Sequence, residues 1–487
     1  MMIKTEHALL LLIFSVLLSP LLLLSLAYEV PYPKTEAERC LERCYKAETE
    51  FSGLLEYADK CQRKYEGGIK EGRGGEEKQR GNPYYFHAES LQSRFRTQEG
   101  HVRVLERFSE KSELLAGIDN FRLAMLEANP NTFVVPHHCD ANSVLFVTRG
   151  KGTISLVRQK KESYNLVRGS VVCVPAGTTV YLVNQDNNEK LNIVKLMQSV
   201  NAPGQFKEYF AGGGTNPEPY YTVFSDDILE RVLNTPRDEL PRLFGQQKKG
   251  MIMKATKEQL RGLSRHVSSP GATSHDSNAP FNLLNQRPRY SNEHGQFFEA
   301  SPEEFKQLQT MDLYVAFSDM DKGSIMAPHY NSRATTVVVV VEGHARIEMG
   351  CPHLSQESQG QRREQRTEQE GYYQKISSHL SPGDVFIIPA GHPFTIVASE
   401  NEKLRTVGFG IHAWNNQRSF LAGRDNIVQQ LEKEAKEMSF NVPAEQVEKV
   451  FSRQRESFYL GGTQQWQRRE EGRGHPLTSI FDFPGFF

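Results

Sequence analysis

The sequence is poor in the residues that would indicate a disulfide scaffold or a nucleic-acid-binding protein. Only 6 of its 487 residues are cysteine, only 2 are tryptophan, and its formal net charge is −1. So few cysteines over this length exclude a disulfide scaffold, and a net charge near zero offers no overall field to attract nucleic acid or an anionic membrane. No Asn-x-Ser/Thr acceptor with a permitted middle residue occurs, so we expect no N-glycosylation.

Long apolar runs are also missing, with one exception at the N-terminus. Lys4 is followed by a leucine-rich run over residues 8–27 that ends in small residues at Ala27. A basic start, an apolar centre and a small-residue exit predict a secretory signal peptide over residues 1–27. The alternative is a membrane anchor, which Pro20 and the lack of a basic stop after the run disfavour.

Three cysteines, Cys40, Cys44 and Cys61, lie in a segment over residues 37–66 that is predicted to be a helical hairpin. Cys40 and Cys44 are one turn apart on the same helical face. Cys61 can therefore close across the hairpin onto either of them. The following residues, 66–82, are rich in Gly, Glu and Arg and are predicted to be a linker, because they have too little apolar surface to bury.

From Asn82 onward the chain consists of short β-type runs separated by Gly, Asn and Pro, such as "NTFVVPHH", "SVLFVTRG" and "TTVYLVN". This spacing is typical of an all-β sandwich or barrel. The stretch "SDDILERVLNT" at 225–235 begins with a Ser-Asp N-cap signature and places apolar residues at helical spacing. A β-barrel followed by a helical extension is therefore predicted.

The second half of the chain repeats the first. "MAPHYNSRATTVVVVVEGHARIEM" at 326–349 parallels "VVPHHCDANSVLFVTRGKGTISLV" at 134–157, and "GDVFIIPAGHP" at 383–393 parallels "GSVVCVPAGTT" at 169–179. "YFAG" recurs as "FLAG", and the string Asn-x-Pro-x-x-x-Leu after Asn234 recurs as Asn-x-Pro-x-x-x-Val after Asn441. Four blocks in the same order indicate two copies of a barrel with a helical extension.

This repeat leads to a predicted domain organisation, with the polar segment at 355–370 as a loop inside the second barrel. The predicted boundaries are 1–27 for the signal peptide, 28–81 for the cysteine-containing helical hairpin and charged linker, 82–264 for the N-terminal barrel with its helical extension, 265–280 for a linker, and 281–487 for the C-terminal barrel with its helical extension and tail.

The barrel motifs resemble the two signatures of cupins, which are jelly-roll barrels, also called double-stranded β-helices. In metal-using cupins the first signature supplies His-x-His and Glu, and a further His follows the Pro-x-Gly turn of the second. Counting back from Gly150 and Gly343 identifies the residues at these places as His137, Cys139, Ser143 and Val180 in the first barrel, and His329, Asn331, Thr336 and Phe394 in the second. Three of the four ligands are replaced in each barrel, so neither barrel is expected to bind the divalent metal ion of an oxidase.

The remaining polar groups of the barrels leave several interpretations open. His137, His138 and His329 are expected to be structural histidines near the barrel mouths. A small anionic molecule could occupy the pockets, with Arg333 and the local histidines as contacts. Cys139 and Cys173 are expected to be buried free thiols, and His137-x-Cys139 is a weaker candidate for a soft metal pair.

A second group of candidate ligands lies outside these signatures. Cys351 and His353 are two residues apart after the run "ARIEMG", and if the chain stays extended there both side chains project to one face. His392 lies in the "PAGHP" turn of the same barrel. A thiolate with two imidazoles suits copper or zinc rather than magnesium or calcium. The alternative is an exposed thiol beside structural histidines.

Together these features resemble vicilin, the 7S globulin of plant seeds, in the strings "NPYYF", "SDDILERVLNTPRDEL", "QFFEASPEE", "EMGCPHLS", "IIPAGHP", "FLAG" and "FDFPGFF". The resemblance implies a non-enzymatic nutrient reservoir, assembled as a homotrimer through its helical extensions and delivered by the secretory pathway to the seed protein storage vacuole. It implies no membrane or nucleic-acid partner. A copper-dependent superoxide scavenger or a small-ligand carrier are the alternative functions.

The resemblance also assigns roles to particular residues. Some vicilins bind copper through a Cys-x-His pair, a later histidine and a tyrosine that precedes the first barrel. These positions correspond to Cys351, His353, His392 and Tyr84, with Tyr85 as the alternative to Tyr84. Relatives usually carry two Cys-x-x-x-Cys pairs in the hairpin, and here Tyr57 stands where the third cysteine would be. The resemblance therefore predicts a Cys40–Cys61 disulfide and a free Cys44.

Overall fold

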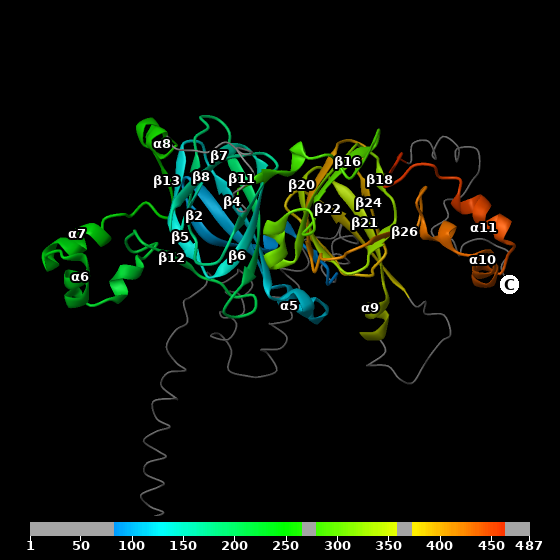
Figure 1. Cartoon of the computed structure of the whole chain (residues 1–487), viewed down its shortest axis with the longest axis horizontal. Helices are drawn as coiled ribbons and strands as arrows, with labels where there is room; N and C mark the ends of the chain where they lie inside the picture. The colour runs from blue at the N-terminus through cyan, green and yellow to red at the C-terminus, as the bar shows by residue number, and fades with distance from the viewer. Residues whose placement is uncertain (1–81, 265–278, 358–372, 463–487) are drawn as a thin grey trace, which may run out of the picture. The chain divides into compact units, whose positions relative to one another are not determined.

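The computed structural model describes residues 82–264, 279–357 and 373–462, which are drawn in colour in Figure 1. The predicted signal peptide, the cysteine hairpin with its Cys40–Cys61 bridge, and most of the two polar loops lie outside these residues. The described chain is mainly β, as the sequence predicts, and its strands form two jelly-roll units. None of the helices in these three ranges is long and apolar enough to cross a membrane.

The first jelly roll is made of two antiparallel sheets. One has the order β14 (Phe281–Asn282), β9 (Ser170–Val174), β6 (Ala141–Arg149), β11 (Leu191–Ser199), β4 (Phe121–Ala128), β3 (Gly100–Leu105), β2 (Leu91–Thr97). The other has the order β12 (Glu208–Phe210), β5 (Thr132–Cys139), β10 (Thr179–Asn184), β7 (Lys151–Val157), β8 (Lys161–Val167), with β13 (Ile252–Lys254) also paired to β5.

The second jelly roll repeats this arrangement, except that two short strands, β18 (Ile325–Met326) and β19 (His329–Asn331), take the place of β5. One sheet has the order β1 (Tyr85–Phe86), β23 (Val385–Ile388), β20 (Thr335–Glu342), β25 (Leu404–Ile411), β17 (Leu313–Met320), β16 (Gly295–Ala300), β15 (Tyr290–Asn292). The other has the order β22 (Gln374–Leu380), β21 (Ala345–Cys351), β24 (Phe394–Ala398), β18, β27 (Tyr459–Leu460), and β19 joins β24 to β26 (Arg418–Phe420).

Alternating side chains from both sheets fill the interior of each jelly roll. In the first, Val134 of β5, Ile154 of β7 and Ile193 of β11 are almost completely buried in one cluster. Gly150 and Gly343 end the corresponding strands β6 and β20 with φ of 83° and 81°. A Cβ at either position would lie 2.2 or 2.1 Å from a backbone carbonyl oxygen, so only glycine fits these repeated turns.

The two jelly rolls exchange short edge strands. β1, from the segment before the first jelly roll, pairs with β23 of the second, and β14, from the segment before the second, pairs with β9 of the first. Phe146 and Phe317 stack between the two large sheets with ring centroids 5.7 Å apart. The exchange carries residues that precede the first jelly roll into the second one, and this positions Tyr84.

The helical extensions explain the repeated Asn-x-Pro string. Helices α6 (Asp226–Leu233) and α10 (Lys433–Phe440) each end in a left-handed asparagine, Asn234 with φ 47° and Asn441 with φ 53°. Asparagine tolerates this conformation better than most residues. Pro236 and Pro443 then begin the next helical segments, which include α7 (Leu240–Phe244) and α11 (Ala444–Phe451). A third helix, α8 (Lys257–Leu263), follows α7 and β13.

Candidate metal centre and barrel cavities

The four positions counted from the cupin signature in the first jelly roll lie around one small cavity. His137 of β5 pairs with Val180 of β10, and both residues, with Cys139 and Ser143, line a space of about 20 Å³. The Nδ1 atom of His137 lies 2.9 Å from the carbonyl oxygen of Val135. Burial lowers the pKa of His137 to about 4, so this imidazole is neutral at pH 7.

The equivalent positions of the second jelly roll also meet at a cavity, of about 40 Å³. His329 pairs with Phe394, and its ring centroid lies 4.4 Å from that of Phe394. Asn331 donates a hydrogen bond to the hydroxyl of Thr336 at 3.2 Å. Burial lowers the pKa of His329 to about 3, and the positive charge of Arg418 lowers it further in the same direction. The imidazole therefore serves as a buried neutral ring.

The two cavities differ in their charge. Arg418 lines the second cavity, and its Nη2 lies 2.6 Å from the carboxylate of Glu299, which also pairs with Arg289 at 3.4 Å. Lys195 lines the first cavity, and among the described residues no carboxylate lies within ion-pair distance of its ammonium group. Arg333, the expected anion contact, is instead half-exposed and faces Asp312 at 3.9 Å. Lys195 in the first jelly roll is therefore a candidate contact for an anion.

Three chain segments converge beside the second jelly roll at the residues predicted to bind copper. The amide of Gly350, one residue before Cys351, donates to the carbonyl of Pro393 at 2.9 Å. The amide of Ile387 donates to the carbonyl of Tyr84 at 2.8 Å. These two backbone contacts place the end of β21 and the start of β1 on either side of the turn that carries His392.

His392 lies at the centre of this group. Its ring centroid is 6.0 Å from that of Tyr84, which it meets edge to face, and 5.4 Å from that of His353. Its Nδ1 lies 3.1 Å from the carbonyl oxygen of Ala390, while its Nε2 is buried without a hydrogen-bond partner among the described residues. Burial lowers the pKa of His392, and the neighbouring His353 adds to this lowering. A neutral ring that donates through Nδ1 keeps the lone pair of Nε2 available for a metal.

Cys351 and His353 depart from the expected geometry. The strand β21 ends at Cys351, and Pro352 begins helix α9 (Pro352–Glu357), so the two side chains do not share one face of an extended strand. Proline is well suited to the first turn of a helix, and it stops the strand here. Cys351 is buried rather than exposed, and burial raises the pKa of its thiol to about 12, whereas His353 is exposed. Cys139 is a buried free thiol as predicted, but Cys173 is only half-buried.

The donor set nevertheless suits a soft or borderline metal. Cys351, His353, His392 and Tyr84 offer sulfur, two imidazole nitrogens and a phenol oxygen, which fit copper better than a hard cation. The unpartnered Nε2 of His392 is a buried atom that a metal would satisfy. The ligand atoms of Cys351, His353 and His392 are farther apart than a bound metal requires, because they do not all lie within 4.8 Å of one another. Among the described residues, a different group, Glu293, His294 and Glu456, meets this distance.

Comparison with known proteins identifies the family. The cupin family model matches residues 89–218 and 281–448, one match in each jelly roll. A vicilin of Corylus avellana is 44% identical over 456 residues, which cover 91% of this chain and 99% of that protein. The chain belongs to the vicilin family.

Solved structures show the same vicilin fold. The vicilin of Solanum melongena is 48% identical, with a TM-score of 0.72 over 78% of this chain and 98% of that one. Another structure of a vicilin from Solanum melongena, with a TM-score of 0.73 and 42% identity, "revealed existence of different anionic ligands in structurally similar pockets". The vicilin-like antimicrobial peptides 2-2 of Macadamia integrifolia are 47% identical over 85% of this chain, but this chain spans only 64% of their length.

The count from the cupin signature correctly identified the residues that line the two cavities. It did not identify the charged side chains beside them. The motif count located the residues at both cavities because it depends on strand alternation and a fixed glycine turn. Lys195 was not singled out, because its strand, "LNIVKLMQS", is an ordinary β-run and its cavity is formed only by folding. Its single basic residue among apolar neighbours was the only signal in the sequence.

Proposed function

We propose that this protein is a non-enzymatic seed storage globulin, carried by the secretory pathway to the protein storage vacuole. The observation that supports this most strongly is the close similarity to the hazelnut vicilin over nearly the whole length of both chains. The buried neutral histidines of the two barrels agree with it, because each barrel presents a single imidazole where a metal-using cupin has several ligands. An immunoblot of the source tissue through germination tests the proposal: the protein should be abundant in dry seed and should disappear as the seedling grows.

The assembly that fits this function is a homotrimer closed through the helical extensions. Apolar side chains on α6, α7, α10 and α11 are exposed in the single chain: Val232 by 70%, Leu243 by 68%, Met438 by 85% and Val450 by 60%. Such faces mark contact sites when they gather on one element. Because the two extensions differ, a contact between them is head-to-tail, and head-to-tail contacts can close into a ring.

We further propose that the protein binds a copper ion through Cys351, His353, His392 and Tyr84. His392 is already oriented by its bond to Ala390, and exposed His353 can rotate toward it. Burial of Cys351 keeps the thiol protonated until a metal displaces the proton. When bound, copper would supply one-electron redox chemistry, whereas the protein residues orient the ligands and exclude water on the side of the buried thiol.

Metal analysis tests the copper site. Protein purified without chelator should contain about one copper per chain, and the Cys351→Ala variant should contain none. Equal copper in both proteins would contradict the site. The alternative function, superoxide scavenging, requires that only the copper-loaded protein, and not Cys351→Ala, accelerates superoxide loss. Four protein ligands leave little open coordination, so we favour storage over this activity.

A small anion in the first jelly roll is the second candidate function, and Lys195 favours it. Lys195 lines the cavity together with neutral His137, and no carboxylate lies within ion-pair distance of its ammonium group among the described residues. Acetate at fixed ionic strength should raise the melting temperature of the protein, and the Lys195→Met variant should lose this response. An equal response in both proteins would contradict the role of Lys195.

A further inference from the structure

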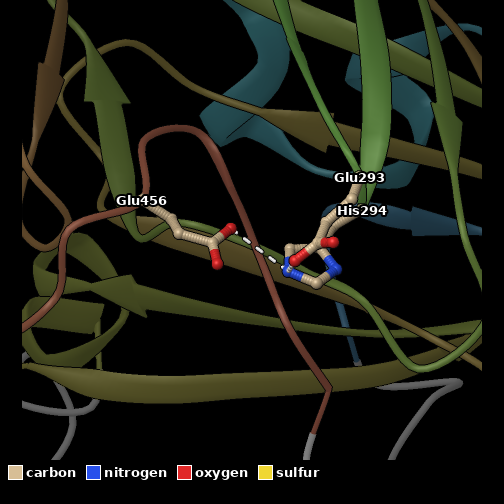
Figure 2. A group of neighbouring side chains, drawn as sticks. All are labelled: Glu293, His294 and Glu456. Carbon is tan, nitrogen blue, oxygen red and sulfur yellow. Dashed lines mark ion pairs between the residues drawn. The ribbon is translucent and has the colours of Figure 1, made fainter.

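A second group of metal-ligand side chains lies at the rim of the second jelly roll, away from Cys351. Glu293 and His294 occupy the turn between β15 and β16, and Glu456 precedes β27. Figure 2 shows the Glu456 carboxylate and the His294 imidazole facing each other across their ion pair. The three ligand atoms all lie within 4.8 Å of one another, although Glu456 comes from a distant part of the chain.

The distances within this group match the edges of a metal coordination polyhedron. The Nε2 atom of His294 lies 3.1 Å from Glu456 Oε2 and 3.5 Å from Glu293 Oε1. In a tetrahedral zinc site with bonds of about 2.0–2.2 Å, neighbouring ligand atoms are roughly 3.3–3.6 Å apart. A zinc ion could therefore bind all three atoms after small side-chain movements, with a fourth position left for water.

The charges of the group are not balanced by the protein. Among the described residues, the carboxylates of Glu293 and Glu456 make ion pairs with His294 alone. Two carboxylates thus share one imidazole, and even a protonated ring leaves one negative charge uncompensated. A divalent cation would remove this excess. Two oxygens with one imidazole nitrogen suit zinc, since calcium and magnesium are bound by oxygen ligands.

Two neighbouring residues, Asn292 and Gly461, support the three proposed ligands. Asn292 donates through Nδ2 to Glu456 Oε2 at 3.1 Å and to the carbonyl of Tyr459 at 2.7 Å, and its Oδ1 accepts from the amide of His294. This residue therefore orients one ligand and anchors the backbone of another. Gly461 leaves space on the imidazole, because a Cβ there would lie 3.2 Å from His294 Nε2. Outer contacts of this kind tune metal affinity.

We propose that Glu293, His294 and Glu456 bind a zinc ion that fastens the C-terminal segment onto the second jelly roll. Shortly after Glu456, that segment forms β27, which pairs with β18 at the edge of the sheet. Phe458 lines the second cavity with its ring centroid 5.7 Å from that of His329, and the hydroxyl of Tyr459 lies 2.6 Å from that of Ser318. Zinc at the rim holds both aromatic residues in place, because it joins their segment to the β15–β16 turn.

Zinc titration of the full chain tests the proposal, with Cys351→Ala as the background so that the copper ligands do not compete. By calorimetry this background should bind about one zinc per chain. His294→Gln and Glu456→Gln should each weaken binding at least about tenfold. Gly461→Ala should weaken it as well, because the added methyl group crowds Nε2 while all three ligands remain.

The matched control is Glu402→Gln, which removes a histidine–glutamate pair with His344 that has no third ligand within reach among the described residues. It should bind zinc as tightly as the background. Zinc should also slow proteolysis after residue 456 in the background and in the control, but not in Glu456→Gln. Absence of zinc binding to the background, or undiminished binding by both His294→Gln and Glu456→Gln, overturns the proposal.

Discussion

The Tyr84 ring meets the His392 imidazole edge to face, with ring centroids 6.0 Å apart. Tyr84 precedes the first jelly roll, whereas His392 lies in a turn of the second. The contact exists because β1 pairs with β23, which leads into that turn. The edge-strand exchange thus brings a phenol from the segment before the first jelly roll to the His392 turn of the second.

Tyr84 and Tyr85 are predicted to have separable roles. Tyr84→Phe should keep the ring contact but lower copper affinity about tenfold, because a ligand oxygen is lost. The Tyr85 hydroxyl donates to the buried carboxylate of Asp384 at 2.9 Å. Tyr85→Phe should therefore lower the free energy of unfolding by about 1–3 kcal/mol and leave the copper content unchanged. Metal analysis and urea unfolding of both variants check this; copper loss in Tyr85→Phe alone would assign the ligand to Tyr85.

Copper affinity should rise with pH because of Cys351. Its pKa of about 12 means that the thiol is protonated in the metal-free protein, and a metal must displace that proton. His392, whose pKa is lowered, is already neutral and releases no proton at pH 7. The thiol proton alone should therefore increase the apparent affinity about tenfold per pH unit between pH 7 and 9, and a proton released by the Tyr84 phenol would make the increase steeper. Competition against a chelator of known pH dependence measures this, and a flat profile would exclude thiolate ligation.

Much of the fold could be predicted from the sequence because its signals are local. Strand alternation, the turns at Gly150 and Gly343, and the Asn-x-Pro strings all depend on a few neighbouring residues, and the structure confirms each of them. The count from the cupin signature assigns His329 and Phe394 to the same site, and in the structure the two residues pair across β19 and β24.

The site was harder to predict because it depends on contacts between distant segments. The expectation that Cys351 and His353 share a strand face was wrong, since Pro352 begins a helix. Arg418 of the second cavity pairs with Glu299, and nothing near either residue in the sequence indicates this contact. Glu456 reaches His294 only because the C-terminal segment returns to the barrel.

Buried His329 should make the protein less stable in acid. Its folded pKa of about 3 lies below the ordinary value of 6.5, so between these values the unfolded chain binds a proton that the folded chain does not. Its contribution to stability is complete above pH 6.5 and is lost as pH falls toward 3, by at most about 1.4 kcal/mol per pH unit.

His329→Phe keeps a ring of similar size among Phe394, Phe420 and Phe458 and removes the titration. It should reduce the pH dependence of the free energy of unfolding below pH 6.5 by the share of His329, while buried His137 keeps its own share. The variant also loses the hydrogen bond to Ala327 at every pH. Urea unfolding from pH 7 to pH 4 at one protein concentration measures the slope. An unchanged slope in His329→Phe would contradict the prediction.

Removing the charge of only one member of the buried Arg418–Glu299 pair should lower the free energy of unfolding. Their side chains are 7% and 8% exposed, and the guanidinium also lies 4.9 Å from the Phe297 ring centroid. Glu299→Gln leaves a buried cation without its charged partner and should lower the free energy of unfolding by about 3–5 kcal/mol. Arg418→Met combined with Glu299→Leu should recover most of that loss. If the double variant is less stable than Glu299→Gln, the pair is not the origin of the effect.

The proposed trimer depends on exposed apolar residues of both helical extensions. Val232→Asp on α6 or Val450→Asp on α11 should each weaken association at least a hundredfold, about 3 kcal/mol per contact, and give monomers by light scattering. Val167→Asp, at an exposed position of β8, should remain trimeric.

Mixing the two variants distinguishes a head-to-tail ring from other arrangements. In such a ring each contact joins the α6 side of one chain to the α11 side of its neighbour. The Val450→Asp chain keeps an intact α6 side, and the Val232→Asp chain keeps an intact α11 side, so one undamaged contact forms between them. The mixture should therefore contain a one-to-one heterodimer, whereas each variant alone stays monomeric. A mixture that contains only monomers would show that the two extensions do not bind each other.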